Sequence, residues 1–319
     1  MKPIHLILLI LISLLLSSCS QPHNPKIKLA INPWPGYEFL YLANEKGLFK
    51  QAGLDIEIIE APSLAEVKRF FRQGKANAMT STMIEAVSLA AQHKKSISIV
   101  LVTDYSNGGD MILAKSDITE FSQIKNKRVG VELGSLGSFF LHQALAKHDL
   151  ALNDIEMLNI EQLDAPDAFD KDIIDAYVTY PPYSNLLLNE FELQKVFDSS
   201  EIPKTILDVV TVSSDLVEQN PEWVTRFHRA WQAALDYAKQ HPIEANNIMA
   251  KREGISADEF AAAFQDLKVL SANEQREILS PKGLSQNMQQ VCTVLNETNS
   301  INFECKALSQ FLSIGKISD

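Results

Sequence analysis

The feature that most constrains this chain is a regular alternation between short stretches that favour β-strands and longer amphipathic stretches that favour helices. Lys26 to Ile31 and Leu54 to Ile59 have the composition of strands, and the second alternates apolar with acidic side chains. Phe39 to Phe49, which lies between them, carries its apolar residues at helical spacing. Strands and helices that alternate with short links predict a mainly parallel sheet covered by helices on both faces.

The alternation continues in the next sixty residues. Ser63 to Glu66 and Thr82 to Glu85 match the capping box that begins helices, and strands are expected at 76–79 and 97–102. A segment rich in turn-forming residues, Asp104 to Asp110, then interrupts the pattern. The first α/β lobe is therefore expected to end at this turn.

A second series of strands and helices follows the turn. Strands are expected at 111–114, 128–131, 155–158 and 175–179, and a helix is expected from Ser138 to Lys147. These segments predict a second α/β lobe.

The rest of the chain has a different character. A further strand, Asp208 to Val212, leads into an almost wholly helical C-terminal third, whose last helix is expected from Glu304 to Leu312. A chain of 319 residues is too long for one compact core, which agrees with a division into two lobes.

The charge of the chain argues against a nucleic-acid partner. Residues 1–18 contain Lys2 as their only charged side chain, so the remainder carries 28 Lys and Arg against 40 Asp and Glu, a net charge of −12. Binding to phosphate backbones needs a concentrated basic surface, and no run of basic residues interrupts the acidity.

The N-terminus has the pattern of a targeting segment. A basic start precedes the apolar run Ile4 to Leu16, which is too short to span a bilayer comfortably. Leu16-Ser17-Ser18-Cys19 resembles the bacterial lipobox, in which the signal peptide (here 1–18) is cut before a cysteine that receives a lipid. The alternative is an ordinary cleaved signal peptide with an incidental Cys19. With the lipid, and with residues 19–25 as lipidated cysteine and spacer, the protein would be periplasmic or extracytoplasmic and anchored to a membrane.

The two remaining cysteines lie near the C-terminus. Cys292 and Cys305 would close a loop of about 14 residues, and a disulfide there would contribute about 3 kcal/mol to stability in an oxidising compartment. The alternative is two buried free thiols.

Common catalytic signatures are missing from the sequence. It contains no HExxH, paired CxxC, Walker GxxxxGK[ST] or GxSxG pattern. No metal, cofactor or catalytic residue is therefore expected, and the chain is expected not to be an enzyme.

Candidate ligand-binding residues in the first lobe follow its expected strands, at the edge where open α/β sheets bind ligands. Trp34 and Tyr37 lie in a stiff segment with two prolines and a glycine, which suits aromatic stacking on a ligand; Trp34 could instead cover the core. Ser81 follows the third strand, beside Thr82, whose hydroxyl is already explained as a helix cap. In the Asp104 to Asp110 turn the candidates are Asp104, Asn107 and Asp110, unless this is only a polar turn.

The second lobe offers two further candidate segments. Ser135 and Ser138 lie between a strand and a helix, where free amides and the positive helix end suit a carboxylate, sulfonate or phosphate. Tyr180 and Tyr183 follow the strand at 175–179 and offer a second aromatic wall, with core packing as the alternative.

Taken in order, these features resemble the substrate-binding proteins of the nitrate, sulfonate, taurine and thiamine-precursor import family, also called the THI5/NMT1-like group. The resemblance covers roughly Lys26 to Pro242 and rests on five stretches and a return strand. They are WPGY at Trp34, GLFKQAGLDIEI at Gly47, DYSNGGD at Asp104, IKNKRVGVELGS at Ile124, DAYVTYPPY at Asp175 and the strand at Asp208.

The resemblance implies a type II periplasmic binding protein with two α/β lobes, a hinge of two crossings and a helical C-terminal part. Lobe 1 is expected to comprise 26–110 plus 214–319, and lobe 2 to comprise 111–213. A monomer of this kind would hold a small molecule between its lobes and deliver it to an ABC permease in the cytoplasmic membrane. All ten candidates named above are expected in the cleft.

Three questions stay open at this point. Asp104, Asp110 and Glu132 suggest an amino or ring-nitrogen ligand, whereas Ser135 to Ser138 suggest an anion such as a sulfonate or nitrate; relatives often carry an acid where this chain has Pro181. A lipoprotein of this type could also regulate a membrane signalling protein. Related pyrimidine-forming enzymes share the fold, but they use a pyridoxal-bearing lysine and a cysteine-rich motif, and this chain has no cysteine cluster.

Overall fold

The computed structural model describes residues 26–93, 96–315 and 317 of the chain. The expected signal peptide, the lipidated Cys19 and the spacer lie outside the described residues. None of the helices within the described ranges is both long and apolar enough to cross a membrane.

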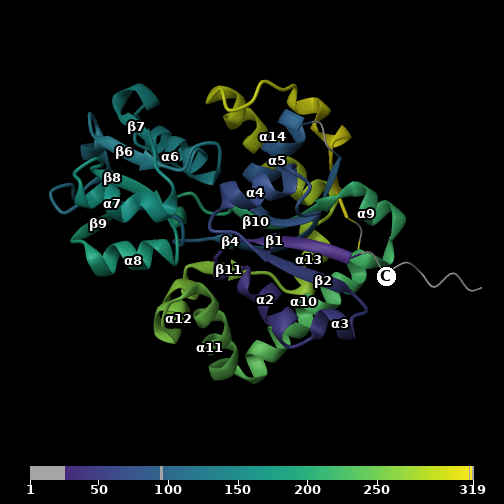
Figure 1. Ribbon diagram of the computed structural model, residues 1–319. Coiled ribbons are helices and arrows are strands. Elements are labelled where there is room, and N and C mark those ends of the chain that lie inside the picture. The colour runs from purple at the N-terminus through teal and green to yellow at the C-terminus, as the bar shows by residue number, and fades with distance from the viewer. Residues whose placement is uncertain (1–25, 94–95, 316, 318–319) are drawn as a thin grey trace, which may run out of the picture.

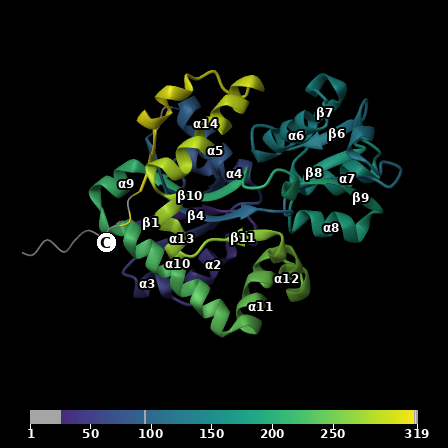
Figure 2. The same cartoon turned by 180° about the vertical axis from the view of Figure 1, so that it is seen from behind.

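Two β-sheets organise the described chain (Figures 1 and 2). The larger has the strand order β11-β4-β10-β3-β1-β2, with β12 also paired to β4. Its strands are β1 (Lys26–Ile31), β2 (Asp55–Glu60), β3 (Ala78–Thr82), β4 (Ile97–Ser106), β10 (Leu207–Ser213), β11 (Leu267–Val269) and β12 (Leu312–Ile314). β1 runs parallel to β2 and β3, whereas β10 runs antiparallel to β3 and β4. Strands β3, β4 and β10 are buried along almost their whole length, as expected where helices cover both faces.

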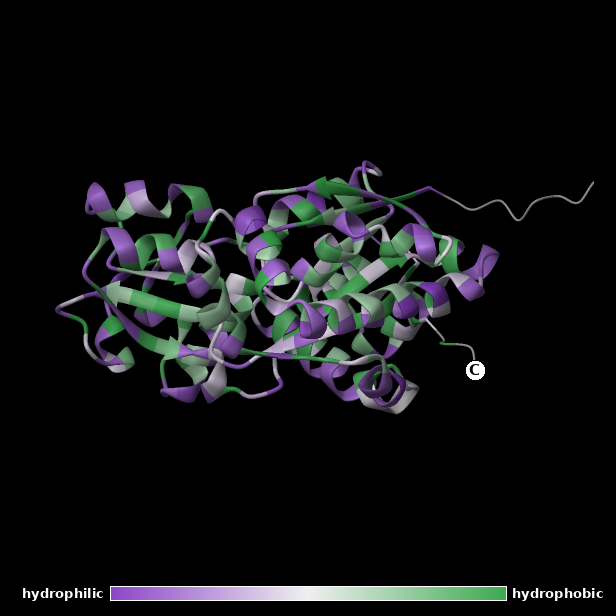
Figure 3. Cartoon of the chain, turned by 90° about the horizontal axis from the view of Figure 1, so that it is seen from below, coloured by the Kyte–Doolittle hydropathy of each residue, from purple (hydrophilic) through white to green (hydrophobic). Residues whose placement is uncertain are grey.

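The smaller sheet has the order β7-β6-β8-β5-β9. Its strands are β5 (Met111–Lys115), β6 (Arg128–Val131), β7 (Glu156–Asn159), β8 (Ala176–Thr179) and β9 (Leu193–Asp198). β6 is parallel to β7 and β8, and β5 is antiparallel to β8 and β9. The two sheets lie side by side along the long axis of the molecule, with hydrophobic residues gathered in their strands (Figure 3).

Helices cover both faces of the larger sheet, with α4, α5 and α14 on one face and α2, α3 and α10 on the other (Figures 1 and 2). The helices that accompany this sheet are α2 (Glu38–Glu45), α3 (Leu48–Gln51), α4 (Leu64–Arg72), α5 (Met83–His93), α9 (Ser214–Gln219), α10 (Glu222–Gln240), α11 (Pro242–Glu253), α12 (Ala257–Gln265), α13 (Ala272–Ile278) and α14 (Pro281–Glu297). Those that accompany the smaller sheet are α6 (Leu136–Lys147), α7 (Ala165–Asp170) and α8 (Tyr183–Glu190). The described ranges also contain five 3₁₀ turns: η1 (Phe121–Ile124), η2 (Leu152–Asp154), η3 (Gln162–Asp164), η4 (Ser199–Glu201) and η5 (Cys305–Gln310).

The chain passes between the sheets twice, from β4 to β5 and from β9 to β10. We call residues 26–106 and 207–315 the large lobe and residues 111–198 the small lobe. Lobe 2 was expected to extend to residue 213, but that range includes β10, which belongs to the larger sheet. The physical reason is that the apolar side chains of β10, among them Val209 and Val210, are fully buried between β3 and β4.

The C-terminal segment differs from its expected form. The predicted helix from Glu304 to Leu312 is the short 3₁₀ turn η5, followed by β12, which pairs in parallel with β4. A disulfide between Cys292 and Cys305 joins α14 to this turn. The helical periodicity was misleading because backbone pairing with β4 takes over the last residues.

Candidate functional site

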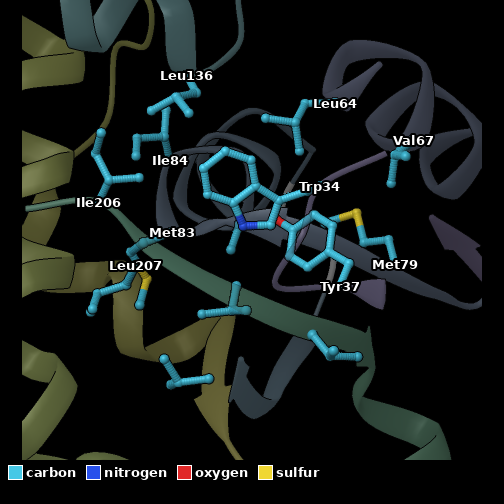
Figure 4. Close-up of a cluster of buried hydrophobic side chains, with 14 of the residues drawn as sticks. Trp34, Tyr37, Leu64, Val67, Met79, Met83, Ile84, Leu136, Ile206 and Leu207 are labelled. Carbon is cyan, nitrogen blue, oxygen red and sulfur yellow. The ribbon is translucent and has the colours of Figure 1, made fainter. Parts of the chain in front are cut away.

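Two aromatic walls meet where the lobes face each other. Trp34 follows β1 in the large lobe and is only 3% exposed, and its ring centroid lies 6.1 Å from that of Tyr180, which follows β8 in the small lobe. The two rings meet edge to face, a favoured arrangement for aromatic pairs. Figure 4 shows Leu64 and Leu136 beside the Trp34 indole. Because Leu136 belongs to α6 of the small lobe, the contact between the lobes is apolar around the indole.

Carboxylates lie on the inner side of this aromatic contact. Asp104 on β4 and Asp208 on β10 are direct cross-strand partners in the larger sheet, and both are buried. The Trp34 Nε1–H donates to Asp104 Oδ1 at 3.2 Å, and the Tyr37 hydroxyl donates to Asp208 Oδ1 at 2.5 Å. Asp110, in the crossing directly before the small lobe, is also buried. Trp34 and Tyr37 therefore hold two acidic groups that could not both be charged side by side without strong repulsion.

Burial controls the protonation of this acidic cluster. It raises the pKa of Asp104 from its ordinary 3.8 to about 7, although hydrogen bonds from Thr103 and Trp34 lower it. Burial also raises the pKa of Asp110 to about 7. The pKa of Asp208 lies well above its ordinary value because of burial and then because of the neighbouring charges of Asp104 and Asp110. The cluster therefore holds protons near neutral pH in the ligand-free protein.

A small cavity lies at the centre of the site. Its volume is about 10 Å³, which is room for one water molecule. It is lined by side chains of both lobes: Asn32, Trp34, Tyr37, Leu64, Asp110, Leu136, Tyr180 and Asp208. Four buried oxygens of these residues have no hydrogen-bond partner within the described part of the chain, and they are Asn32 Oδ1, Asp110 Oδ2, Asp208 Oδ2 and the Tyr180 hydroxyl. Three of these four oxygens can only accept, unless a carboxyl is protonated.

The anion-binding site expected at the start of α6 is occupied by a side chain of the protein itself. The Ser135 hydroxyl donates to Glu85 Oε1 at 2.8 Å, and the backbone N–H of Leu136 donates to the same oxygen at 2.7 Å. Glu85 lies on α5 in the large lobe and is fully buried. The positive end of α6 is therefore satisfied by a carboxylate of the other lobe.

The remaining candidates lie at varying distances from the cavity. The Tyr183 ring stands 5.7 Å from Tyr180, and its hydroxyl donates to the carbonyl of Pro62 in the large lobe. Ser81 is buried on β3, and its hydroxyl has no partner among the residues that the structure describes. Asn107 is exposed at the crossing between the lobes, and Ser138 is half-buried in a separate groove.

The structure thus brings Trp34, Tyr37, Asp110 and Tyr180 to one cavity, with Asp104 directly behind Trp34. Sequence reasoning missed Asp208, Glu85 and Asn32 as site residues. Asp208 had a visible signal, since a carboxylate embedded in an apolar strand needs an explanation. Glu85 had none beyond its capping box, because its partners lie fifty residues away in the other lobe.

The backbone at Gly36 lies close to the Asp104 carboxylate. A Cβ atom at this position would lie 1.9 Å from Asp104 Oδ2, so no side chain fits without moving the carboxylate. We expect Gly36→Ala to lower the free energy of unfolding by about 1–3 kcal/mol, because overpacking forces buried groups apart. Urea denaturation measures this loss.

The double variant Gly36→Ala with Asp104→Ala serves as the control for this prediction. Its loss should be smaller than the sum of the two single losses, since removal of the carboxylate relieves the clash. Full additivity, or an unchanged midpoint for Gly36→Ala, would contradict the proposed contact.

Comparisons with known proteins agree with this architecture. The family model described as NMT1/THI5 like matches residues 34–245. The 4-amino-5-hydroxymethyl-2-methylpyrimidine phosphate synthase THI11 of Saccharomyces cerevisiae is 25% identical over 236 residues, which cover 69% of this chain and 69% of the yeast protein. The putative binding protein BAB2_1146 of Brucella abortus is 23% identical over 295 residues, covering 88% of this chain and 83% of that protein.

Solved structures share the fold at lower identity. The alkanesulfonate-binding protein SsuA from Xanthomonas axonopodis pv. citri, solved with bound MOPS, has a TM-score of 0.76 to this chain at 15% identity. The likeness covers 91% of this chain and 98% of that one. The fold predicted from the sequence, that of periplasmic binding proteins, is therefore confirmed.

Proposed function

The chain belongs to the NMT1/THI5-like family, and on this premise we propose that it is a solute-binding protein that captures a small nitrogen-rich molecule between its lobes. We further propose that it is tethered outside the cytoplasmic membrane through Cys19 and acts as a monomer. It would deliver its solute to an ABC permease, with no bond made or broken.

The observation that carries the proposal is the group of buried carboxylates beside Trp34. Asp104, Asp110 and Asp208 meet at the contact between the lobes, and Asp110 and Asp208 each present there an oxygen without a partner among the described residues. Acceptor oxygens of this kind call for a ligand with several N–H donors. A protonated amine or ring nitrogen would also supply the charge that lets the carboxylates ionise.

These acceptor oxygens favour one of the ligand classes expected from the sequence. A sulfonate or nitrate would meet carboxylates, and the helix start that suits an anion is already filled by Glu85. A pyrimidine with an exocyclic amine presents several N–H donors and a flat face that suits Trp34 and Tyr180. The yeast relatives are named for the synthesis of an aminopyrimidine phosphate, whose ring belongs to this class.

The lobes must separate for such a ligand to enter. A cavity of about 10 Å³ cannot hold a pyrimidine, so the described conformation is a closed one in which side chains of the two lobes touch. Hinge motion at the two crossings is the usual means of opening such a fold. A ligand favours the closed form only through contacts that the open form lacks.

A thermal-shift screen tests the proposal. The probes are 4-amino-5-hydroxymethyl-2-methylpyrimidine, spermidine, methanesulfonate and nitrate, at equal ionic strength. We expect one of the nitrogen bases to raise the Tm, since a ligand at 100 times its Kd adds about 2.7 kcal/mol. Stabilisation by methanesulfonate or nitrate alone would refute the proposed ligand class, and so would a lack of response to all four probes.

Asp208→Asn is expected to lower the affinity for the ligand without lowering the stability of the ligand-free protein. The substitution keeps an acceptor for the Tyr37 hydroxyl and removes a carboxyl that must otherwise be neutralised. The ligand-free variant should be at least as stable as the natural protein, while its affinity for the stabilising base falls by about tenfold or more, equivalent to 1.4 kcal/mol. Isothermal titration measures this affinity.

Asp55→Asn is the matched control, because it removes a carboxyl from exposed β2 of the same sheet. Its affinity for the base should not change. Full affinity in Asp208→Asn would show that this carboxylate does not face the ligand.

A further inference from the structure

One carboxylate joins the lobes directly. Glu85 Oε1 on α5 accepts from the Ser135 hydroxyl at 2.8 Å and from the Leu136 N–H at 2.7 Å, both at the start of α6. These bonds connect residues fifty positions apart in sequence and on opposite lobes. The contact is buried on both sides, so water does not weaken it.

The second oxygen of the same carboxylate is held within the large lobe. Glu85 Oε2 accepts from the backbone N–H of Thr82 at 2.9 Å and from its hydroxyl at 2.5 Å. The Thr82 hydroxyl oxygen in turn accepts from the N–H of Ile84. Glu85 therefore completes a capping box on its own helix and caps the helix of the other lobe with the oxygen that remains.

The donors that Glu85 takes are those that an anionic solute would use. α6 is a helix of 12 residues, and its cap residue Ser135 makes no side-chain bond to its own helix because its hydroxyl points to Glu85. A carboxylate in this position satisfies the free N–H and the positive helix end. A sulfonate or nitrate would have to displace it and would also meet its negative charge.

The charge of Glu85 also acts on the cavity. It contributes to the raised pKa of Asp110 and of Asp208, so it lies close enough to add to the negative potential there. Lys68 on α4 lies beside this contact and donates to the carbonyl of Gly134. Without the Glu85 side chain, the Ser135 hydroxyl, the Leu136 N–H and the Lys68 ammonium group would surround a space that holds no negative charge.

We infer that Glu85 is a specificity-determining and positioning residue, which ties the small lobe to the large one and reserves the closed site for solutes without an anionic group. The inference rests on the proposed function, because it assumes that the solute lies between the lobes. It extends that function by assigning the rejection of anions to one side chain outside the cavity lining.

Glu85→Ala tests the inference through a gain of function. The variant should acquire a saturable thermal shift with methanesulfonate, measured against sodium chloride at the same ionic strength, that the natural protein lacks. Its radius of gyration in small-angle scattering should be larger without ligand, because the bonds between α5 and α6 are gone. Its affinity for the stabilising base should fall by about tenfold, a change of 1.4 kcal/mol.

Two variants keep the result interpretable. Glu274→Ala removes an equivalent capping box, formed with Ser271 on α13, without touching the contact between the lobes, so it should show none of these changes. Glu85→Gln loses the charge and keeps one acceptor oxygen, which can face the Ser135 hydroxyl and the Leu136 N–H while the Thr82 N–H loses its acceptor. It should remain closed, bind no methanesulfonate and lose part of the affinity for the base, and it serves as the test should Glu85→Ala fail to fold.

The outcomes separate this inference from the proposed function. The base response of the natural protein tests the function alone. The role of Glu85 is overturned if Glu85→Ala binds methanesulfonate no better than the natural protein, or if Glu274→Ala gains the same response. It is equally overturned if Glu85→Gln retains the full affinity for the base.

Discussion

Replacement of Arg252 by methionine is expected to lower the free energy of unfolding by about 3–5 kcal/mol, since it leaves a buried charge without its partner. The Arg252 side chain is 2% exposed and that of Glu38 is fully buried. The guanidinium donates at 2.5 Å to Glu38 and also to the carbonyls of Asn32 and Ile31. It therefore fixes the end of β1 from which the Trp34 segment begins.

The pH dependence of this loss has a defined sign. Burial raises the pKa of Glu38 to about 7 even though Arg252 lowers it. Without Arg252 the folded protein must keep Glu38 protonated, while the unfolded chain ionises it near the ordinary 4.5. Below about pH 7 Glu38 is protonated in the folded natural protein as well, so the loss should grow as the pH rises above about 7.

Urea denaturation at two pH values measures the effect. Lys251→Met is the matched control, because it removes an exposed cation from the same helix. The double variant Arg252→Met with Glu38→Gln should be more stable than Arg252→Met alone, because no charge is then stranded. A loss under about 1 kcal/mol, or one equal to that of the control, would contradict the role assigned to this ion pair.

The ligand-free protein as a whole should be more stable at pH 5.5 than at pH 8. The buried acids of the site retain protons that the unfolded chain releases near pH 4: the pKa of both Asp104 and Asp110 is raised to about 7, and burial raises that of Glu132 to about 8. A folded state that binds more protons loses stability as the pH rises through this range. One buried group opposes the trend, since burial lowers the pKa of His228 to about 4.

The size of this effect follows from proton counting. Each net proton that the folded state retains is worth about 1.4 kcal/mol per pH unit, so a single net proton over two units changes stability by about 3 kcal/mol. Calorimetry at the two pH values measures it. Asp208→Asn should flatten the slope, whereas Asp55→Asn on exposed β2 should not.

A bound nitrogen base should weaken this pH dependence, because the carboxylates beside it then hold no more protons in the folded state than in the unfolded chain. A cation stabilises ionised carboxylates, so its affinity should rise between pH 5.5 and the pH at which the base itself loses its proton. Stability of the ligand-free protein that is flat or rising with pH would show that these acids are ionised without a ligand. It would also remove the reason to expect a cationic ligand.

Local patterns in the sequence predicted most of the elements. The alternation in Leu54 to Ile59 and the capping box at Ser63 and Glu66 correspond to β2 and to the start of α4. Such patterns depend on neighbouring residues only, so they can be recognised without a partner. The C-terminal strand β12 could not be predicted in this way, because its three residues form a strand only through pairing with β4.

The candidate site was predictable in part. Trp34 and Tyr37 were recognisable because a stiff turn after a strand is a usual place for ligand contacts. Their partners were not recognisable, since Asp104 and Asp208 come together only through antiparallel pairing of strands a hundred residues apart. The expected role of Ser135 shows the same limit, because its helix start suits an anion and the sequence does not reveal that Glu85 supplies it.

The amino-acid sequence by itself determined the α/β class, the order of the elements and the turn at which the first sheet gives way to the second. These properties arise from periodicity, capping and turn residues, which act over a few positions. Only the tertiary structure decided that β10 returns to the larger sheet, that three carboxylates are buried beside Trp34, and that Glu85 fills the start of α6. Charge and hydrogen bonding at the site depend on groups brought together from distant positions, and burial then fixes their protonation.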